Sequence, residues 1–340
     1  MFSRRQFFSR LINSAHDVVE NNWDDLAFGK PDPHYSNPEE GAQWLDFIVT
    51  HWDDLVEAWA PITDAHSQNV LEHILLYRVL SYLHVKLPLN TPEYWALREN
   101  LDQYVVERNI DKSWIIPLSK LAIRDLQYVG HQGGLLTIFL LGQYYYNREV
   151  RIRPEVGDVV LDAGGCWGDT SIAFADSVGD TGKVYVFEFV KSNVRRATAN
   201  FDLNPRIRPR LELVERPLGR RSGDVLYYED RGPATWLFET PPPNSAQATT
   251  ISIDDFVESR QLDKVDFIKM DIEGGEYAAL EGATRTIQRF QPKLAISIYH
   301  RPEDLFLIPK LVLALGLNYR LFVDHYLLID QETVLYAVAG

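Results

Sequence analysis

A glycine-rich turn follows an apolar run at residues 159–170, which read VVLDAGGCWGDT. The run is typical of a buried strand, and the turn leads into a segment with a helical pattern. Glycine is needed where the main chain turns sharply and comes close to a ligand, because a β-carbon would collide there. We therefore expect a strand, a ligand-binding turn and a helix, in that order.

The segments after this turn alternate between β-type and helical patterns. Such alternation is typical of parallel strands joined by right-handed crossovers, so a Rossmann-like α/β sheet is predicted. Two β-type runs with only a turn between them close the chain, which predicts an antiparallel hairpin at one edge of the sheet. The expected sheet is seven-stranded and mostly parallel, with strands at 159–162, 184–189, 211–214, 267–271, 294–299, 319–323 and 334–338.

The first 120 residues show a helical pattern, with apolar residues spaced three and four apart, and are predicted to form an α-helical accessory domain. Thr91 followed by Pro92 is a typical helix start, because Thr can cap free amides and Pro needs no donor in the first turn. That helix is expected to run to Glu107. This domain could cover an acceptor site or form a homodimer interface, and its pattern does not decide between the two.

Residues 121–153 have a different pattern. Two β-type runs, 126–129 and 135–141, are separated by Gly133 and Gly134, which predicts a β-hairpin linker. Residues 154–340 are then expected to form the ligand-binding domain.

The composition disfavours several classes of partner and location. The 48 Asp and Glu residues outnumber the 34 Lys and Arg residues, and the net charge of −14 would repel a phosphate backbone, so nucleic acid is not expected. The only cysteine is Cys166, which fits a cytoplasmic location. The pair Arg4-Arg5 resembles a twin-arginine export signal, but polar and acidic residues follow it, so export is not expected. No apolar run reaches the roughly 18 residues of a membrane span.

Two acids stand where strands of the predicted sheet end. Ligands of open α/β sheets bind at the carboxyl ends of the strands, where Asp162 can meet the cationic amine of S-adenosylmethionine. A second β-type run ends at Glu188, about 20 residues past Gly168, and its carboxylate can accept hydrogen bonds from two ribose hydroxyls. With Gly164 and Gly165, these residues predict a nucleoside-containing cofactor.

The same acids leave two alternatives open. An enzyme that binds NAD or another nucleotide would use Glu188 equally well. It is disfavoured because residues 164–168 lack the spaced dinucleotide fingerprint, and because Asp162 would bring like charge to a pyrophosphate. The other alternative is a binding protein that has this fold but no catalytic activity. The presence of both Asp162 and Glu188 argues against it.

A second group of acids follows the β-type run 267–271. Asp271 and Glu273 would point to the same side, toward the space beyond the transferable methyl group. Glu276 is interpreted as a first-turn helix acid that complements the helix dipole. His300 ends the next run and is the leading choice for a general base, with His325 as a weaker second.

The expected chemistry is an in-line displacement in which alignment supplies much of the catalysis. In the transfer to a hydroxyl that the family resemblance described next implies, His300, with Asp271, would remove or receive the proton of the attacking hydroxyl. A magnesium-assisted version, with Asp271, Glu273 and His300 as Mg²⁺ ligands, is kept as an alternative, and no metal site is assigned.

These segments resemble a known family. Residues 157–170, 184–204 and 265–300, above all the block DFIKMDIEG at 266–274, resemble the FkbM-type methyltransferases over roughly residues 140–340. The resemblance implies a class I methyltransferase fold and S-adenosylmethionine as methyl donor. It also implies transfer of the methyl group to an oxygen, commonly a hydroxyl of a sugar, glycan or secondary metabolite, and donor binding by Asp162, Gly164 and Glu188.

Asn193 and Asn200 match asparagines that are common after the ribose-binding acid in this family, and Asn193 is assigned to the cofactor site. Two departures from the family matter. Phe189 follows Glu188 where the family usually has proline, and residues 1–120 lie outside the shared region. The acceptor is therefore the least defined part of the prediction.

Overall fold

The computed structural model describes residues 3–20, 22–25, 29–31, 37–108, 114–117, 126–235, 237–238, 240–241, 243 and 245–340. Its centre is a seven-stranded sheet with the order β14-β15-β13-β12-β6-β7-β8. The strand β15 runs antiparallel to both of its neighbours, and the other strands are mutually parallel. The strands are β6 (Val159–Ala163), β7 (Lys183–Phe187), β8 (Leu211–Val214), β12 (Phe267–Met270), β13 (Lys293–Ser297), β14 (Tyr319–His325) and β15 (Thr333–Ala339). The predicted sheet and its closing hairpin are confirmed.

The glycine turn follows the middle strand of this sheet. The strand β6 pairs with β7 on one side and with β12 on the other, so Leu161 lies level with Tyr185 and Ile268. Residues 160–163 are buried because helices cover both faces, which explains why the run is apolar rather than alternating. The carboxyl ends of β6, β7, β12 and β13 consequently meet at one edge.

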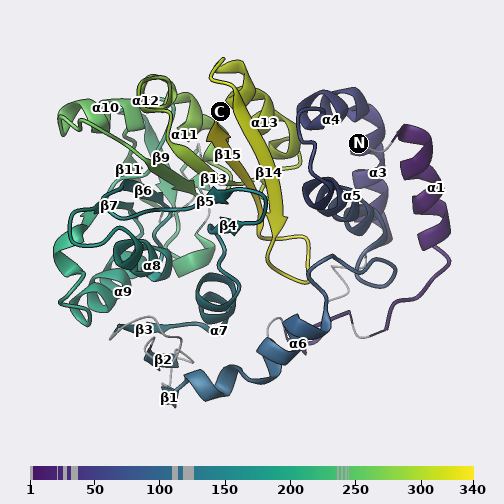
Figure 1. Ribbon diagram of the computed structural model, residues 1–340, viewed down its shortest axis with the longest axis horizontal. Coiled ribbons are helices and arrows are strands. Elements are labelled where there is room, and N and C mark those ends of the chain that lie inside the picture. Colours follow the sequence, from purple (N-terminus) through teal and green to yellow (C-terminus); the bar gives the residue numbers. More distant parts are fainter. Residues whose placement is uncertain are drawn as a thin grey trace.

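Helices lie on both faces of the sheet (Figure 1). On one face, Phe174 of α8 packs against the ring of Phe267, and α9 belongs to the same apolar cluster. On the opposite face, Phe256 of α10 packs against Phe187. The helices are α8 (Asp169–Ser177), α9 (Lys191–Asp202), α10 (Ile253–Ser259), α11 (Glu276–Glu281), α12 (Thr284–Phe290) and α13 (Asp304–Ala314).

A small second sheet is inserted between β8 and α10, and sequence analysis did not predict it. It has the order β10-β9-β11, with β9 at Val225–Tyr228, β10 at Leu237–Phe238 and β11 at Ala246–Thr249. The 3-10 helix η6 (Gly232–Ala234) precedes β10, and another, η5 (Arg208–Arg210), precedes β8. These short strands carry little periodic pattern, which is why they were missed.

The N-terminal part contains the predicted helices, which pack beside α13 and β14 (Figure 1). The range predicted as helical, up to residue 120, also includes the strands Glu107–Arg108 and Trp114–Pro117. Trp59 donates a 2.7 Å hydrogen bond from Nε1 to the carbonyl of Leu305, and the hydroxyl of Ser67 lies 2.8 Å from the amide of Val323. The helices are α1 (Arg4–Ser14), α3 (Pro38–Thr50), α4 (Trp52–Trp59), α5 (Ala65–Leu80) and α6 (Pro92–Glu99). The proposed domain limits at residues 120 and 153 stay a prediction.

Thr91 caps α6 as expected, because its hydroxyl accepts from the amide of Tyr94. The predicted end of this helix at Glu107 is wrong. The helix ends at Glu99. The side-chain amide of Asn100 donates to the carbonyl of Ala96, which satisfies a terminal carbonyl and competes with helix continuation. A 3-10 helix, η2 (Leu101–Tyr104), follows.

The hairpin predicted for 126–141 is also wrong. The strand β3 (Gln127–Gly130) pairs with β2 (Trp114–Pro117), which pairs with β1 (Glu107–Arg108). Residues 132–140 are helical: α7 is Gln132–Gly134, and η4 is a π-helix at Leu135–Leu140. A short apolar run is equally compatible with a strand and with a buried helix. Gly133 and Gly134, which were expected to form a turn, lie at the start of the helical segment. A small hairpin does follow, between β4 (Tyr146–Asn147) and β5 (Arg151–Ile152).

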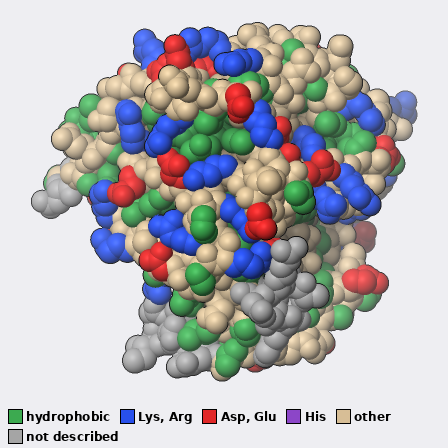
Figure 2. All heavy atoms as spheres, turned by 60° about the vertical axis from the view of Figure 1, so that its left-hand side comes forward, with side chains coloured by type: hydrophobic (Ala, Val, Ile, Leu, Met, Phe, Trp, Pro, Cys, Tyr) green, Lys and Arg blue, Asp and Glu red, His purple; other side chains and the backbone are tan. Residues whose placement is uncertain are grey.

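The surface mixes both signs of charge. On the face shown in Figure 2, Lys and Arg side chains are interspersed with Asp and Glu side chains. In the part of the chain that the structure describes, no helix is long and apolar enough to cross a membrane.

Candidate active site

A cavity of about 350 Å³ lies at the carboxyl ends of β6, β7, β12 and β13. Loops that leave these strands line one side of it, and the segment 132–144 lines another. Leu327 and Glu332, from the turn between β14 and β15, also reach it. The cavity lies where ligands bind in parallel α/β sheets, as the sequence predicted.

The glycine turn brings the backbone against the neighbouring strand. Gly164 lines the cavity with φ +82°, and a β-carbon on it would lie 1.8 Å from the carbonyl oxygen of Asp271. Gly165 and Gly168 do not line the cavity but shape the turn. A β-carbon on Gly165 would lie 2.2 Å from Val186, and one on Gly168 would lie 2.5 Å from the Phe201 ring.

Asp162 is fully buried beneath this turn and does not line the cavity. Its carboxylate accepts hydrogen bonds from the hydroxyls of Thr170 and Ser171, at 2.8 and 2.6 Å, and faces Lys269 at 3.3 Å. The ammonium of Lys269 in turn donates to the carbonyl of Gly164 at 2.7 Å. Asp162 thus holds the strand, the turn and the helix together. The sequence analysis expected it to contact the ligand, but the structure places it outside the cavity.

Asp169, which sequence analysis did not select, is the acid of this turn that does line the cavity. Its carboxylate accepts a 3.2 Å hydrogen bond from Tyr128, and burial raises the pKa of Asp169. It is the first helical residue of α8, a position where acids are common for reasons of helix stability. Because an acid at this position is explained by helix stability alone, the sequence gives no sign that Asp169 lines the cavity.

Glu188 and Asn193, which the sequence assigns to the cofactor site, lie together on the cavity wall. One carboxylate oxygen of Glu188 accepts from the amides of Phe189 and Val190, at 2.7 and 2.8 Å, and the other accepts from Asn193 at 3.2 Å. Asn193 also accepts from the indole of Trp167. Burial raises the pKa of Glu188, although these donors favour the charged form. The Glu188 carboxylate is therefore a fixed hydrogen-bond acceptor, suited to a ligand that carries two adjacent hydroxyls.

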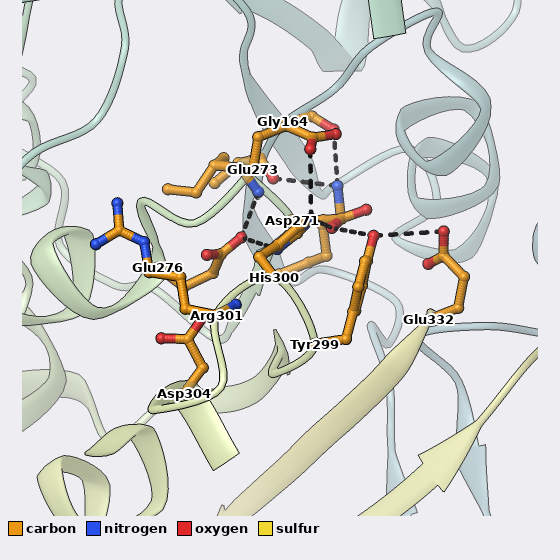
Figure 3. Close-up of polar contacts among 12 residues, drawn as sticks. Gly164, Asp271, Glu273, Glu276, Tyr299, His300, Arg301, Asp304 and Glu332 are labelled. Carbon is orange, nitrogen blue, oxygen red and sulfur yellow. Dashed lines mark hydrogen bonds and ion pairs between the residues drawn. The ribbon is translucent and has the colours of Figure 1, made fainter. Parts of the chain in front are cut away.

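Asp271 follows β12 and is held by two tyrosines, one of which, Tyr299, is shown in Figure 3. The hydroxyl of Tyr144 donates to one carboxylate oxygen at 2.9 Å, and that of Tyr299 donates to the other at 3.1 Å. Burial opposes ionisation, but the charges of His300 and Lys269 hold the pKa of Asp271 below its usual value. Tyr144 has φ +71°, a strained conformation for a non-glycine residue.

His300 lies among three carboxylates (Figure 3). Its Nδ1 is 3.0 Å from Glu276, and its Nε2 is 3.5 Å from Asp271 and 3.6 Å from Glu273. Burial disfavours the charge, but the three acids outweigh it and raise the pKa of His300 to about 10. The imidazole is therefore a cation near neutral pH and has no free lone pair, which conflicts with the predicted role as general base.

The neighbouring acids differ in environment. Glu276 is the first residue of α11, as expected, and it also accepts from the amide of Ile272 at 2.6 Å and pairs with His300. Glu273 is half exposed, has φ +56°, and burial of its carboxylate raises its pKa to about 7. Ligand atoms of Asp271, Glu276 and His300 come within 4.8 Å of one another, whereas the proposed magnesium set named Glu273 in place of Glu276.

His325, the second histidine considered, lies away from the cavity on β14. It is buried, its Nδ1 is 2.9 Å from the hydroxyl of Thr333, and burial lowers its pKa to about 4. It is a neutral core residue.

The sheet, its helices and the position of the cavity define a class I, Rossmann-like methyltransferase fold. Residues 153–323 match the methyltransferase FkbM domain, and the chain belongs to this family of S-adenosylmethionine-dependent methyltransferases. The structure is similar to that of methyltransferase FkbM from Methylobacillus flagellatus KT, with a TM-score of 0.55 and 20% identity over 86% of this chain and 60% of that chain. The present chain thus spans 60% of that protein's length, and the two share a fold.

Similarity to two further solved structures is weaker. Fibrillarin of Aeropyrum pernix with bound S-adenosyl-L-methionine gives a TM-score of 0.36 at 14% identity, over 69% of this chain and 99% of that chain. An S-adenosylmethionine-dependent O-methyltransferase of Thermotoga maritima gives 0.35 at 13% identity, over 54% and 60%. Among curated proteins, none matches the chain.

Proposed function

We propose that this protein transfers a methyl group from S-adenosylmethionine to a hydroxyl oxygen of a sugar, a glycan or a secondary metabolite. The observation that carries the proposal is the division of one cavity into two ends. Glu188 and Asn193, after β7, provide fixed polar groups at one end. Asp271 and its two tyrosines lie at the end of β12, two strands away with β6 between. At about 4.8 Å per strand, that distance suits a donor lying across the strand ends.

The residues of the first end fit the donor. Glu188 would accept hydrogen bonds from the ribose hydroxyls, because its carboxylate is fixed by backbone amides and lines the cavity. Gly164 lines the cavity and brings its backbone against the carbonyl of Asp271, where a β-carbon would collide. Asp169 would face the donor's cationic amine, in place of the buried Asp162. When bound, the donor supplies an electrophilic methyl group on a positively charged sulfur.

The residues of the second end suit an uncharged or cationic acceptor. Asp271, Glu273 and Glu332 line this part of the cavity, and an anionic acceptor would meet like charge. The hydroxyls of Tyr144 and Tyr299 also lie here and can orient a polyhydroxyl compound through hydrogen bonds. A sugar hydroxyl satisfies both conditions.

His300 acts in this proposal as a fixed cation that positions its neighbours. Its charge compensates the acids around it and keeps Asp271 ionised, so that both tyrosine hydroxyls point at that carboxylate. A magnesium-assisted version would require His300 to give up its proton to the solvent before it could bind the metal. Activity that survives exhaustive chelation would discard that version.

The proposal is tested by transfer of a deuterated methyl group from S-adenosylmethionine to simple glycosides, followed by mass spectrometry. Methylated glycoside supports it, and a methyl group found only on nitrogen or carbon contradicts the oxygen specificity. Binding of the donor with no transfer to any acceptor class would favour the non-catalytic alternative. A cytoplasmic location, a homodimer and a covering role for residues 1–120 remain predictions.

A further inference from the structure

We propose that Glu332 is the general base of this site and takes the proton of the acceptor hydroxyl. The inference rests on the proposed function, because it needs a hydroxyl acceptor. Sequence analysis did not select Glu332, since no strand end or motif marks it.

Glu332 reaches the cavity from the turn between β14 and β15, far in sequence from the other acids. It has φ +66°, which a glutamate adopts at a cost of roughly 1 kcal/mol or more. Its carbonyl accepts a 3.2 Å hydrogen bond from the amide of Tyr326, which closes the turn. The turn therefore holds a strained backbone and directs a carboxylate into the cavity.

The carboxylate of Glu332 is oriented but not neutralised. The side-chain amide of Gln143 donates to one oxygen, and the hydroxyl of Tyr299 lies 3.4 Å from the other (Figure 3). Tyr299 lies between Glu332 and Asp271 and contacts both. Within the described residues Glu332 forms no ion pair, whereas Asp271 faces His300.

The other titratable groups around this end are less suited to accept a proton. Asp271, after β12, already accepts from two tyrosines and has a lowered pKa. His300, after β13, carries a proton near neutral pH. Glu273, in the loop before α11, is half exposed and lies 3.6 Å from His300. Burial and the charge of Asp271 raise the pKa of Glu332 to about 7, near the range where a base works best.

The step balances without a further reactant. The O–H bond of the acceptor breaks, and its proton passes to a carboxylate oxygen of Glu332. The freed electron pair on the acceptor oxygen forms the new bond to the methyl carbon, and the carbon–sulfur bond breaks with its electrons remaining on sulfur. Protonated Glu332 then returns its proton to water.

The test compares Glu332→Gln with Glu99→Gln, an exposed glutamate on α6, using methyl α-D-glucopyranoside as the probe acceptor. We expect kcat of Glu332→Gln to fall about 100-fold or more, while affinity for S-adenosylhomocysteine stays within about twofold. Glu99→Gln should match the wild type. In Glu332→Ala, added formate should restore part of the turnover, because it can occupy the vacated space and accept the proton.

A spectroscopic measurement checks the same residue without turnover. Infrared difference spectra of the wild type should show carboxyl absorption near pH 7 from both Glu332 and Glu273. One component should be missing in Glu332→Gln, and a different component should be missing in Glu273→Gln. The assignment would be overturned if the wild type methylated the probe and Glu332→Gln did so equally fast. It would also be overturned if formate restored none of the turnover that is lost in Glu332→Ala. A wild type that methylates no hydroxyl probe would instead contradict the proposed function itself, and this assignment with it.

Discussion

Charge determines what each residue of the cavity can do. His300 lies within 3.6 Å of three carboxylates and is a cation, while Asp271 accepts from Tyr144 and Tyr299 and is held ionised. Because these groups compensate each other, removal of any one leaves a buried charge without its partner. The group is therefore expected to affect stability as well as catalysis.

Replacement of His300 by Gln should destabilise the fold in a pH-dependent manner. The pKa of His300 rises from 6.5 to about 10 on folding, so its contribution is fully present below about pH 6.5 and is lost as the pH rises toward 10. We expect the substitution to lower the free energy of unfolding by about 3 kcal/mol at pH 6 and by less at pH 9. Urea unfolding at both pH values measures it, with the exposed His16→Gln as control. A cost that grows with pH would contradict this charge assignment.

Single residues were predicted from sequence where a motif marked them, and missed where tertiary contacts decide. Glu188 and Asp271 stand directly after strands, and both line the cavity. Asp162 has the same sequence signal, but its side chain points under the turn toward Thr170 and Ser171. Glu332 comes from a turn of unusual backbone conformation, which no residue pattern reveals.

At the scale of elements, the glycine turn between β6 and α8 connects cofactor binding to the sheet. The amides of Gly164 and Gly165 donate to the carbonyl of Phe187, at 3.0 and 3.1 Å, so the turn is tied to β7. On the other side, Gly164 approaches the carbonyl of Asp271. Both neighbouring strands therefore constrain this turn.

Replacement of Gly164 by Ala should destabilise the protein by about 3 kcal/mol and weaken binding of S-adenosylhomocysteine at least ~10-fold. The reason is a double penalty, since the residue has φ +82° and its new β-carbon would lie 1.8 Å from a backbone oxygen. Gly223→Ala is the matched control, because Gly223 has φ +97° with no atom near the β-carbon position, and should cost only ~1 kcal/mol. Equal effects of the two changes in thermal unfolding and calorimetry would show that the close contact is unimportant.

Elements with a clear period were predicted well from sequence. The seven strands follow apolar runs bounded by turns, and all were located to within a few residues. The run 135–141 was misassigned because Leu135, Leu136 and Ile138 are buried in a π-helix, whose apolar spacing resembles that of a short buried strand. The short strands β9–β11 depend on pairing with one another and carry no pattern of their own.

At the scale of the whole molecule, the N-terminal helices and the sheet share a hydrophobic core. Ile48, Leu55 and Ile74 belong to the same buried cluster as Val312 and Val323. His66 also pairs with Asp324 of β14 at 2.8 Å, and Arg148 binds the other oxygen of that acid. The helices should consequently unfold together with the edge of the sheet.

Replacement of Trp59 by Ala should lower the free energy of unfolding by about 3–5 kcal/mol while the transition stays cooperative. Trp59 is buried between α4 and α13 and bonds the carbonyl of Leu305. Trp59→Phe keeps a ring and should cost only ~1–2 kcal/mol. Far-ultraviolet circular dichroism and tryptophan fluorescence during urea unfolding provide the comparison. Separate transitions for helix content and for the sheet would contradict a shared core.

The most direct test of the whole account is titration calorimetry of the wild type and Glu188→Gln with S-adenosylhomocysteine, with NAD⁺ as the competing ligand. We expect saturable one-to-one binding to the wild type, at least ~10-fold weaker binding to Glu188→Gln because a charge-assisted ribose contact is lost, and no heat with NAD⁺. Absence of S-adenosylhomocysteine binding, together with saturable binding of NAD⁺, would contradict the assignment of the cavity.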